Sequence, residues 1–341
     1  MLEHGGRLRA AAQAYGIPLA DWLDLSTGIN PQGYPVPPLD PVCWQRLPED
    51  DDGLEAAAAA YYGNHRLLAL PGSQAAIQLL PAFFAPAAVA CLAPLYEEHP
   101  QAWARAGHKL RRLHGGSPGA ALARALGAAT PNVVLCNPNN PSAGRLSRAE
   151  LLAAAAQLHR RGGWLIVDEA FADDRPDDCV TPCAGTPEAP NLIVLRSLGK
   201  FFGLAGARVG FVFGAAEKLD RLREALGPWP LSGPARAAAR HALEDTVWQA
   251  AARRALTAAG ERLAALLAPF GEGENGADVH ACALFATFAT AQADALYEHL
   301  ARRAILVRRF ADHGLLRFGL PGDEAGWQRL TRALDEWRAA Q

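Results

Sequence analysis

The chain has 341 residues, of which 50% are hydrophobic and 20% are charged, and its formal net charge is −2. This length and apolar content suffice for one large or two moderate domains with a buried core, and they do not indicate disorder. The near-neutral charge gives no reason to expect a nucleic acid or a membrane as partner, so chemistry on a small molecule is the favoured class of function.

Residues 1–35 form a predicted N-terminal arm that is rich in Gly and Pro and contains one amphipathic stretch, Arg7 to Tyr15. The first seven residues lack the apolar run of a secretory signal, so a cytoplasmic location is expected. The six cysteines are scattered, without a Cys-x-x-Cys pair or a Cys/His grouping. They are expected to be reduced thiols, and no metal site is expected.

Residues 36–235 alternate helical patterns with short apolar runs, which is typical of a largely parallel sheet covered by helices on both faces. The ligand site of such a sheet lies at the carboxyl ends of its strands. The predicted strands are Val89–Leu92, Leu110–Leu113, Val133–Cys136, Leu165–Val167, Leu192–Leu195 and Val209–Phe213.

Residues 236–268 are rich in Ala, Arg and Leu and predict one long helix that links two domains. A Gly-rich segment at 271–276 then follows, near the start of a smaller α+β domain that is expected over residues 269–341.

Two segments early in the large domain suit a phosphate group and a flat ring. Gly72-Ser73-Gln74 reads as a turn into a helix N-terminus, whose free N–H groups bind anions, although many helices begin in this way. Tyr96 is either a core aromatic or a surface on which a ring stacks.

Two polar residues follow predicted strands further along the chain. Asn140, in Asn-Pro-Asn-Asn-Pro, belongs either to a plain turn or to a site where it donates a hydrogen bond to a cofactor oxygen. Asp168 closes a buried strand and needs a partner there, such as a protonated pyridine nitrogen. Mg²⁺ is the competing partner, but the sequence has no Gly-x-x-x-x-Gly-Lys-Ser/Thr phosphate loop.

The chain has only three lysines, at 109, 200 and 218, so chemistry that needs a primary amine has three candidates. Lys200 follows a strand and stands among Gly and aromatic residues, where a desolvated lysine becomes a neutral nucleophile. Ser197 and Arg208, three residues before it and eight after it, offer a hydroxyl and a guanidinium to a neighbouring phosphate.

Together these segments resemble the fold type I aminotransferase superfamily over nearly the whole chain. The resemblance implies a fold type I transferase: a large domain with a mostly parallel seven-stranded sheet covered by helices, and a smaller α+β C-terminal domain. It also implies a homodimer with shared active sites and pyridoxal 5′-phosphate as the cofactor, held by Lys200 as a Schiff base.

The same resemblance implies a role for each matching residue. Asp168 pairs with the pyridine nitrogen, Asn140 contacts the phenolic oxygen, and Tyr96 stacks on the ring. The phosphate is held by Gly72, Ser73, Gln74, Ser197 and Arg208, and by Tyr61 of the neighbouring subunit.

One departure from the superfamily pattern is Phe171, where the usual residue is a tyrosine that hydrogen-bonds the phenolic oxygen. The missing hydroxyl weakens an aminotransferase assignment more than it weakens cofactor binding.

A narrower resemblance lies in the arm. His4-Gly5-Gly6, followed by Ser26-Thr27-Gly28-Ile29-Asn30-Pro31, resembles the opening of threonine-phosphate decarboxylases of cobalamin biosynthesis. It implies that His4 and Gly28 lie at the substrate, with Gly28 in place of the asparagine of related enzymes.

In the C-terminal domain, Arg308 and Arg317 each end an apolar run, and arginine suits bidentate binding of carboxylate or phosphate. By the resemblance, Arg317 takes the substrate carboxylate and Arg308 helps to bind its phosphate or carboxylate, with Arg309 as a substitute for Arg308.

The function implied is the decarboxylation of L-threonine O-3-phosphate to (R)-1-amino-2-propanol O-2-phosphate. A histidinol-phosphate-type aminotransferase is the first alternative, because it shares the superfamily motifs. A non-catalytic subunit that binds pyridoxal phosphate is the second.

Overall fold

The computed structural model describes residues 4–128, 130–271 and 279–340. The chain divides into a large unit, residues 34–140 and 144–251, and a small unit, residues 1–33, 141–143 and 252–341. Residues 272–276 of the predicted Gly-rich segment lie outside the described residues.

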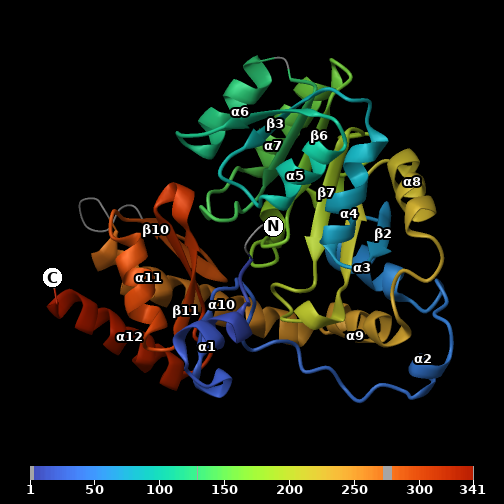
Figure 1. The fold of residues 1–341 in the computed structure, drawn as a ribbon. Helices are drawn as coiled ribbons and strands as arrows, with labels where there is room; N and C mark the ends of the chain where they lie inside the picture. The colour runs from blue at the N-terminus through green and yellow to red at the C-terminus, as the bar shows by residue number, and fades with distance from the viewer. Residues whose placement is uncertain (1–3, 129, 272–278, 341) are drawn as a thin grey trace. The chain divides into compact units, whose positions relative to one another are not determined.

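The large unit contains a seven-stranded sheet in the order β2-β8-β7-β6-β5-β3-β4 (Figure 1). All its strands are parallel except β8, which is antiparallel to both of its neighbours, so the predicted mostly parallel sheet of seven strands is confirmed. Strand β2, a four-residue apolar run, was not predicted from the sequence. The strands are β2 Leu67–Leu70, β3 Ala88–Leu92, β4 Lys109–Leu113, β5 Asn132–Cys136, β6 Trp164–Asp168, β7 Leu192–Ser197 and β8 Gly210–Phe213.

Helices cover both faces of this sheet, which is why its strands are apolar along their whole length. Side chains of α4, α5 and α8 share one core with alternate strand residues such as Val134 and Ile166. The intervening residues, such as Val133 and Leu165, point to the other face and are also fully buried, where α6 and α7 pack against β3 and β6. The helices of the large unit are α2 Val42–Gln45, α3 Leu54–Tyr62, α4 Ser73–Leu79, α5 Glu98–Arg105, α6 Pro118–Gly127, α7 Arg148–His159, α8 Ala216–Leu226 and α9 Gly233–Glu244.

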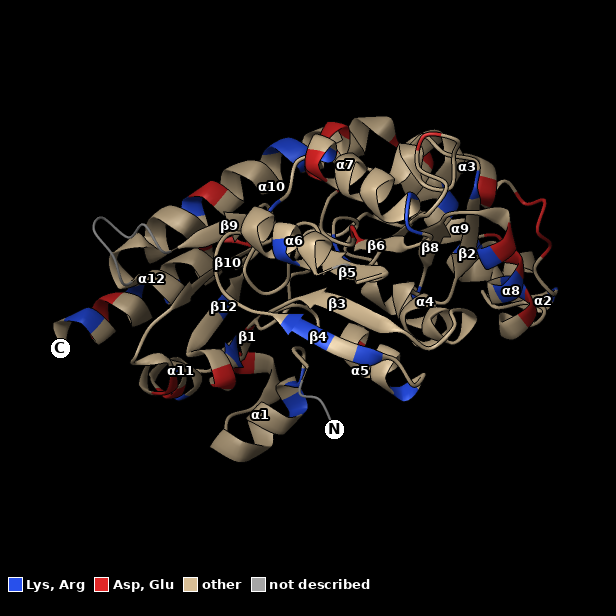
Figure 2. Ribbon diagram, turned by 90° about the horizontal axis from the view of Figure 1, so that it is seen from above, with Lys and Arg blue, Asp and Glu red and all other residues tan. Residues whose placement is uncertain are grey.

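Strand β4 forms one edge of the large sheet and carries basic side chains (Figure 2). Lys109, Arg111 and Arg112 are exposed on it. Charged residues on an edge strand disfavour pairing with the edge of another sheet, so this edge is protected from aggregation.

The small unit contains a five-stranded sheet in the order β1-β11-β12-β10-β9. Strand β1 comes from the N-terminal arm and pairs in parallel with β11, while the other pairs are antiparallel. Ala11 of α1 and Trp22 pack with Leu306 of β11 in one apolar cluster, so the arm is part of the small unit's core. The elements of the small unit are α1 Leu8–Tyr15, β1 Leu23–Leu25, β9 His280–Cys282, β10 Phe285–Ala289, α11 Ala293–Ala301, β11 Ile305–Phe310, β12 Leu315–Gly319 and α12 Glu324–Ala339.

The single long helix predicted over 236–268 is wrong in one respect, because the segment forms two helices. Helix α9 ends at Glu244, and α10, Thr246–Leu267, begins two residues later. Asp245 leaves the helical conformation, with ψ at 79°, and its Oδ1 accepts a hydrogen bond from Trp248 N at 2.9 Å. Aspartate favours such capping over continuing a helix, and composition alone does not reveal the break. Among the described residues, no helix has both the length and the apolarity that crossing a bilayer requires.

Candidate active site

Three neighbouring parallel strands of the large unit end at one edge, and each is followed by a predicted site residue. Cys136 at the end of β5 pairs in register with Asp168 at the end of β6, and Asp168 pairs with Leu195 of β7. Asn140 and Lys200 lie in the segments that directly follow β5 and β7. Ligands of α/β sheets bind at such carboxyl ends.

Lys200 is half-buried beside an aromatic ring. Its Nζ lies 5.3 Å from the centre of the Phe171 ring, which is itself buried. Of the other lysines, Lys109 is exposed on the edge strand, and Lys218 donates to the Phe83 carbonyl oxygen at 3.0 Å. Lys200 is therefore the lysine that stands at the strand ends with the other predicted site residues.

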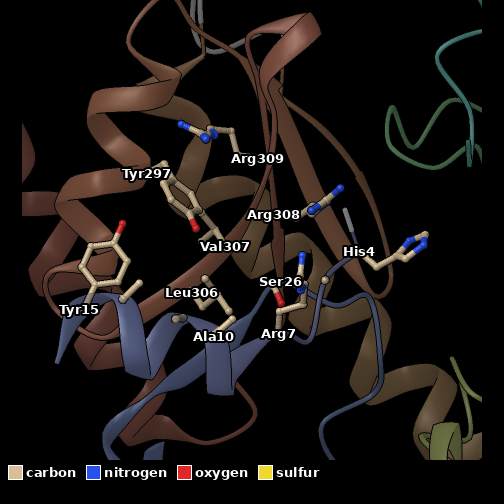
Figure 3. A pocket seen from close by; sticks show the side chains of 13 residues that line it. His4, Arg7, Ala10, Tyr15, Ser26, Tyr297, Leu306, Val307, Arg308 and Arg309 are labelled. Atoms are coloured by element: carbon tan, nitrogen blue, oxygen red, sulfur yellow. The ribbon is translucent and has the colours of Figure 1, made fainter. Parts of the chain in front are cut away.

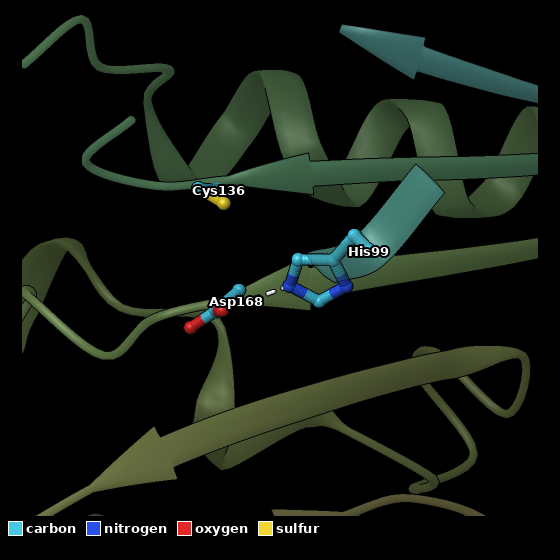
Figure 4. A group of neighbouring side chains, drawn as sticks. All are labelled: His99, Cys136 and Asp168. Atoms are coloured by element: carbon cyan, nitrogen blue, oxygen red, sulfur yellow. Dashed lines mark hydrogen bonds and ion pairs between the residues drawn. The ribbon is translucent and has the colours of Figure 1, made fainter. Parts of the chain in front are cut away.

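Asp168 is held by two hydrogen-bond partners in a buried position. Its Oδ2 lies 2.9 Å from Nε2 of His99, and its Oδ1 accepts from the main-chain N–H of Ala170 at 3.0 Å (Figure 4). His99 is only 1% exposed, so this contact fixes the carboxylate in one orientation. The sequence analysis missed His99; its position three residues after Tyr96, in the first turn of α5, was the available signal.

His99, Asp168 and Cys136 also form a group of possible metal ligands, with their ligand atoms within 4.8 Å of one another (Figure 4). Burial raises the pKa of the Cys136 thiol well above its usual value. Within this group, the 2.9 Å contact between His99 Nε2 and Asp168 Oδ2 supports the carboxylate.

Two glycines, Gly72 and Gly210, allow close contacts at the segment that is predicted to bind the phosphate. Gly72 has φ of +73°, and a Cβ there would lie 2.6 Å from Nη2 of Arg208. A Cβ on Gly210 of β8 would lie 2.4 Å from the main-chain nitrogen of Ser73. The start of α4 and the Arg208 guanidinium are thereby brought together. Ser197 ends β7, and its Oγ accepts from the N–H of Gly199 at 3.2 Å.

Gln74 contacts the aromatic residue that is expected to stack on the ring. The Tyr96 hydroxyl donates to Gln74 Oε1 at 3.2 Å, and Gln74 Nε2 donates to Glu98 Oε2 at 3.0 Å. Burial raises the pKa of Tyr96, so its hydroxyl remains a donor. The Gln74 side chain thus orients Tyr96, and its main-chain N–H is the group that suits a phosphate.

Two asparagines fix the loop that carries Asn140. The Asn137 side chain donates to the Leu146 carbonyl oxygen at 3.1 Å and accepts from the Leu146 N–H at 2.8 Å. Asn139 Nδ2 donates to the carbonyl oxygen of Pro94 at 2.7 Å. The first two asparagines of the motif are therefore structural, and Asn140 is the one suited to a ligand contact.

A buried charge network lies behind this edge and was not predicted. Arg196 donates to Glu169 Oε2 at 3.0 Å and to Asp173 Oδ1 at 2.8 Å, and all three side chains are at most 2% exposed. The Tyr61 hydroxyl donates to the same Asp173 oxygen at 3.0 Å. A buried arginine is tolerated when carboxylates pair with it, so the network holds the segment after Asp168 in place.

In the small unit, Arg308 of β11 and Arg317 of β12 are direct cross-strand partners. Directly opposite residues of an antiparallel pair share one face of the sheet, and like charges there repel each other. Arg317 is 6% exposed and donates through Nη2 to the Ser26 carbonyl oxygen at 3.0 Å. Two guanidinium groups on one face of the sheet are suited to binding an anion.

A cavity of about 340 Å³ in the small unit is lined by His4, Ser26 and Arg308, among other residues (Figure 3). Gly28 and Arg317, the other two predicted substrate residues, do not line this cavity. Arg309, the expected substitute for Arg308, instead donates to Asp294 Oδ1 at 3.0 Å.

The residues of the large unit fit pyridoxal phosphate in their chemistry. They include an amine, a buried carboxylate for the pyridine N–H, an amide and a flat aromatic ring. A close-packed Gly-Ser turn beside an arginine suits the phosphate, because the main chain approaches it without steric hindrance.

Comparison with known proteins agrees with this fit. The family model for aminotransferase class I and II matches residues 47–334. The chain is 50% identical to the threonine-phosphate decarboxylase of Pseudomonas aeruginosa over 334 residues, covering 98% of this chain and 97% of the relative. It is 41% identical to that of Sinorhizobium sp, covering 98% of this chain and 97% of the relative.

Among solved structures, the fold is similar to histidinol-phosphate aminotransferase from Sinorhizobium meliloti in complex with pyridoxal-5′-phosphate. The TM-score is 0.79 at 21% identity, and the match covers 98% of this chain and 95% of that chain. At this identity the likeness concerns the fold alone.

Proposed function

The chain belongs to the aminotransferase class I and II family, and from this premise we propose that it decarboxylates L-threonine O-3-phosphate. The product is (R)-1-amino-2-propanol O-2-phosphate, a precursor in cobalamin biosynthesis, and the cofactor is pyridoxal 5′-phosphate. The observation that carries the proposal is the 50% identity with a threonine-phosphate decarboxylase over 98% of this chain. The cross-strand pair Arg308–Arg317 supports it, because the substrate has two anionic groups.

The cofactor, when bound, accepts the electron pair of the bond that breaks at the substrate Cα. Asp168 is suited to keep the pyridine nitrogen protonated, since its carboxylate is buried and held by His99. Lys200 would hold the cofactor, and its amine, once protonated, is suited to return a proton to the substrate Cα after carbon dioxide has left.

Substrate orientation decides which bond at Cα breaks. A carboxylate held by Arg317 and a phosphate held by His4 and Arg308 would fix two ends of a small molecule. These contacts would determine which bond at Cα is cleaved. Arg317 is itself held by a hydrogen bond of 3.0 Å to the Ser26 carbonyl oxygen. Phe171 provides no hydroxyl beside Lys200, in contrast to the superfamily pattern.

The proposal includes a homodimer in the cytoplasm, in which Tyr61 reaches the phosphate in the neighbouring subunit. Large apolar side chains on the large unit support a subunit contact, since Trp44 is 72% exposed and Trp229 is 56% exposed. The six cysteines are free thiols, which suits a reducing compartment.

The experiment is incubation of the purified holoenzyme with L-threonine O-3-phosphate, with and without 2-oxoglutarate, while carbon dioxide and glutamate are both measured. Carbon dioxide release without 2-oxoglutarate supports the decarboxylase. Glutamate formed only with 2-oxoglutarate would make the protein an aminotransferase. Cofactor absorbance without turnover of any phosphorylated amino acid would make it a non-catalytic subunit.

A further inference from the structure

The cavity of the small unit carries more positive charge than the predicted substrate contacts supply. Among the described residues, its lining includes His4, Arg7, Arg308 and Arg309 but no aspartate or glutamate. Arg309 is neutralised by Asp294. The Arg7 guanidinium, in contrast, has no ion pair or hydrogen bond to another described residue.

The main chain before Arg7 is docked tightly on Ser26. The N–H of Gly6 donates to Ser26 Oγ at 2.7 Å, and that hydroxyl donates to Asp24 Oδ1 at 2.6 Å. A Cβ on Gly5 would lie 2.2 Å from the Ser26 carbonyl oxygen, so this approach requires glycine. Because Ser26 is only 2% exposed, the docking point is rigid and fixes the position from which Arg7 extends.

The docking brings Arg7 to the predicted anion site. Leu25 of β1 pairs with Val307 of β11, so Ser26 follows β1 next to Arg308 on the neighbouring strand. Figure 3 shows Arg7, Arg308 and His4 on one side of the cavity and Arg309 on the other. Cationic side chains that line one cavity favour a ligand with several anionic oxygens, and guanidinium groups bind such oxygens in pairs.

We propose that Arg7 is a ligand of the substrate phosphate and makes the enzyme specific for phosphorylated over unphosphorylated threonine. The identity of the substrate rests on the proposed function, whereas the binding of a phosphate group at Arg7 does not. Arg7 acts with His4 and Arg308, and the Gly6–Ser26 hydrogen bond holds it in place.

The test compares Arg7→Ala, Arg7→Lys and Arg9→Ala in the holoenzyme. Arg9 is the matched control, because it is exposed in α1, two residues after Arg7, and does not line the cavity. KM and kcat are measured with L-threonine O-3-phosphate, and the Kd of inorganic phosphate is measured by calorimetry. Arg7→Ala should raise both KM and the phosphate Kd by about tenfold, the loss of one hydrogen bond to a charged group.

Additional measurements distinguish a loss of phosphate binding from a loss of folding, and from an error in the proposed reaction. Arg7→Lys should recover part of the affinity, while kcat, cofactor absorbance and the Arg9→Ala values should remain unchanged. Equal KM and phosphate Kd in Arg7→Ala and Arg9→Ala would overturn the assignment of Arg7. If the wild type binds inorganic phosphate through Arg7 but releases no carbon dioxide, the assignment holds and the proposed reaction fails.

Discussion

The Nζ atom of Lys200 lies 5.3 Å from the centre of the Phe171 ring. The amine therefore faces a hydrocarbon surface, where the superfamily pattern has a tyrosine hydroxyl. A tyrosine here would donate a hydrogen bond to the phenolic oxygen of the cofactor. Phe171 has no hydroxyl, so that oxygen would interact instead with the nitrogen that links the cofactor to Lys200.

Phe171→Tyr should lower the pKa at which the bound chromophore changes colour. The new hydroxyl competes for the phenolic oxygen and so weakens the contact that keeps the neighbouring nitrogen protonated. The measurement is a visible absorbance titration against pH of wild type and variant. Superimposable titrations would contradict the role given to Phe171.

Borohydride reduction of the yellow holoenzyme, followed by peptide mass spectrometry, should label Lys200 and neither Lys109 nor Lys218. Reduction makes the link between lysine and cofactor permanent, and the chain has only these three lysine side chains. Lys200→Ala should abolish the labelling and the release of carbon dioxide, while Lys109→Ala, on the exposed edge strand, should retain both. A label on Lys218 would refute the assignment.

Asp168→Asn should lower kcat by about 100-fold or more, because an amide no longer stabilises a charged pyridine nitrogen. His99→Ala should cause a smaller loss, and His99→Gln should recover part of it, since glutamine retains a donor near Asp168. His108→Gln is the matched control, because His108 is also buried but contacts the Pro81 carbonyl oxygen at 3.0 Å. A kcat of His99→Ala no lower than that of His108→Gln would remove His99 from the site.

His4→Ala and Arg308→Ala should each raise KM for the phosphorylated substrate by about tenfold, from the loss of one hydrogen bond to a charged group. Cofactor binding, followed by absorbance at rising pyridoxal phosphate concentration, should not change, because both residues belong to the small unit. Arg309→Ala serves as control, since that guanidinium is paired with Asp294. Unchanged kinetics in both test variants would withdraw the substrate assignment.

Arg236→Ala should lower the free energy of unfolding by about 3 kcal/mol, because it breaks a largely buried ion cluster. Arg236 is 3% exposed and binds Asp52 and Glu55, with contacts of 2.7 Å to each. Denaturant unfolding measures the change, and Arg262→Ala, which breaks an exposed pair with Glu324, should show no measurable effect.

The ion cluster of Arg236, Asp52 and Glu55 also makes the free energy of unfolding depend on pH. Burial raises the pKa of Asp52, but hydrogen bonds from Arg236 and the Leu54 N–H outweigh this and lower it overall. Because its pKa is lowered in the folded state, Asp52 adds to the free energy of unfolding at pH values above the ordinary pKa of aspartate. This contribution is lost as the pH falls through the lowered pKa. Below about pH 4, the free energy of unfolding of the Arg236→Ala variant should therefore fall less with decreasing pH than that of the wild type. An identical dependence would contradict the pairing.

The sequence by itself predicted six of the seven strands of the large sheet and the candidate cofactor residues, because both predictions depend on local patterns. Apolar runs such as Val133–Cys136 are buried on both faces, and polar residues such as Asp168 and Asn140 lie within four residues after the ends of such runs. The strand order brings these residues to one edge, so the motifs alone indicated a common site.

Only the tertiary structure decided which side chains support that site. His99 joins Asp168 across 69 positions of the chain, and Arg196 pairs with Asp173 inside the core. No periodicity encodes such contacts, since they depend on how elements pack. The pairing of Arg308 with Arg317 depends on the register of β11 and β12, and a shift of one residue would place the two side chains on opposite faces. The docking of Gly6 on Ser26 likewise exists only because β1 lies beside β11.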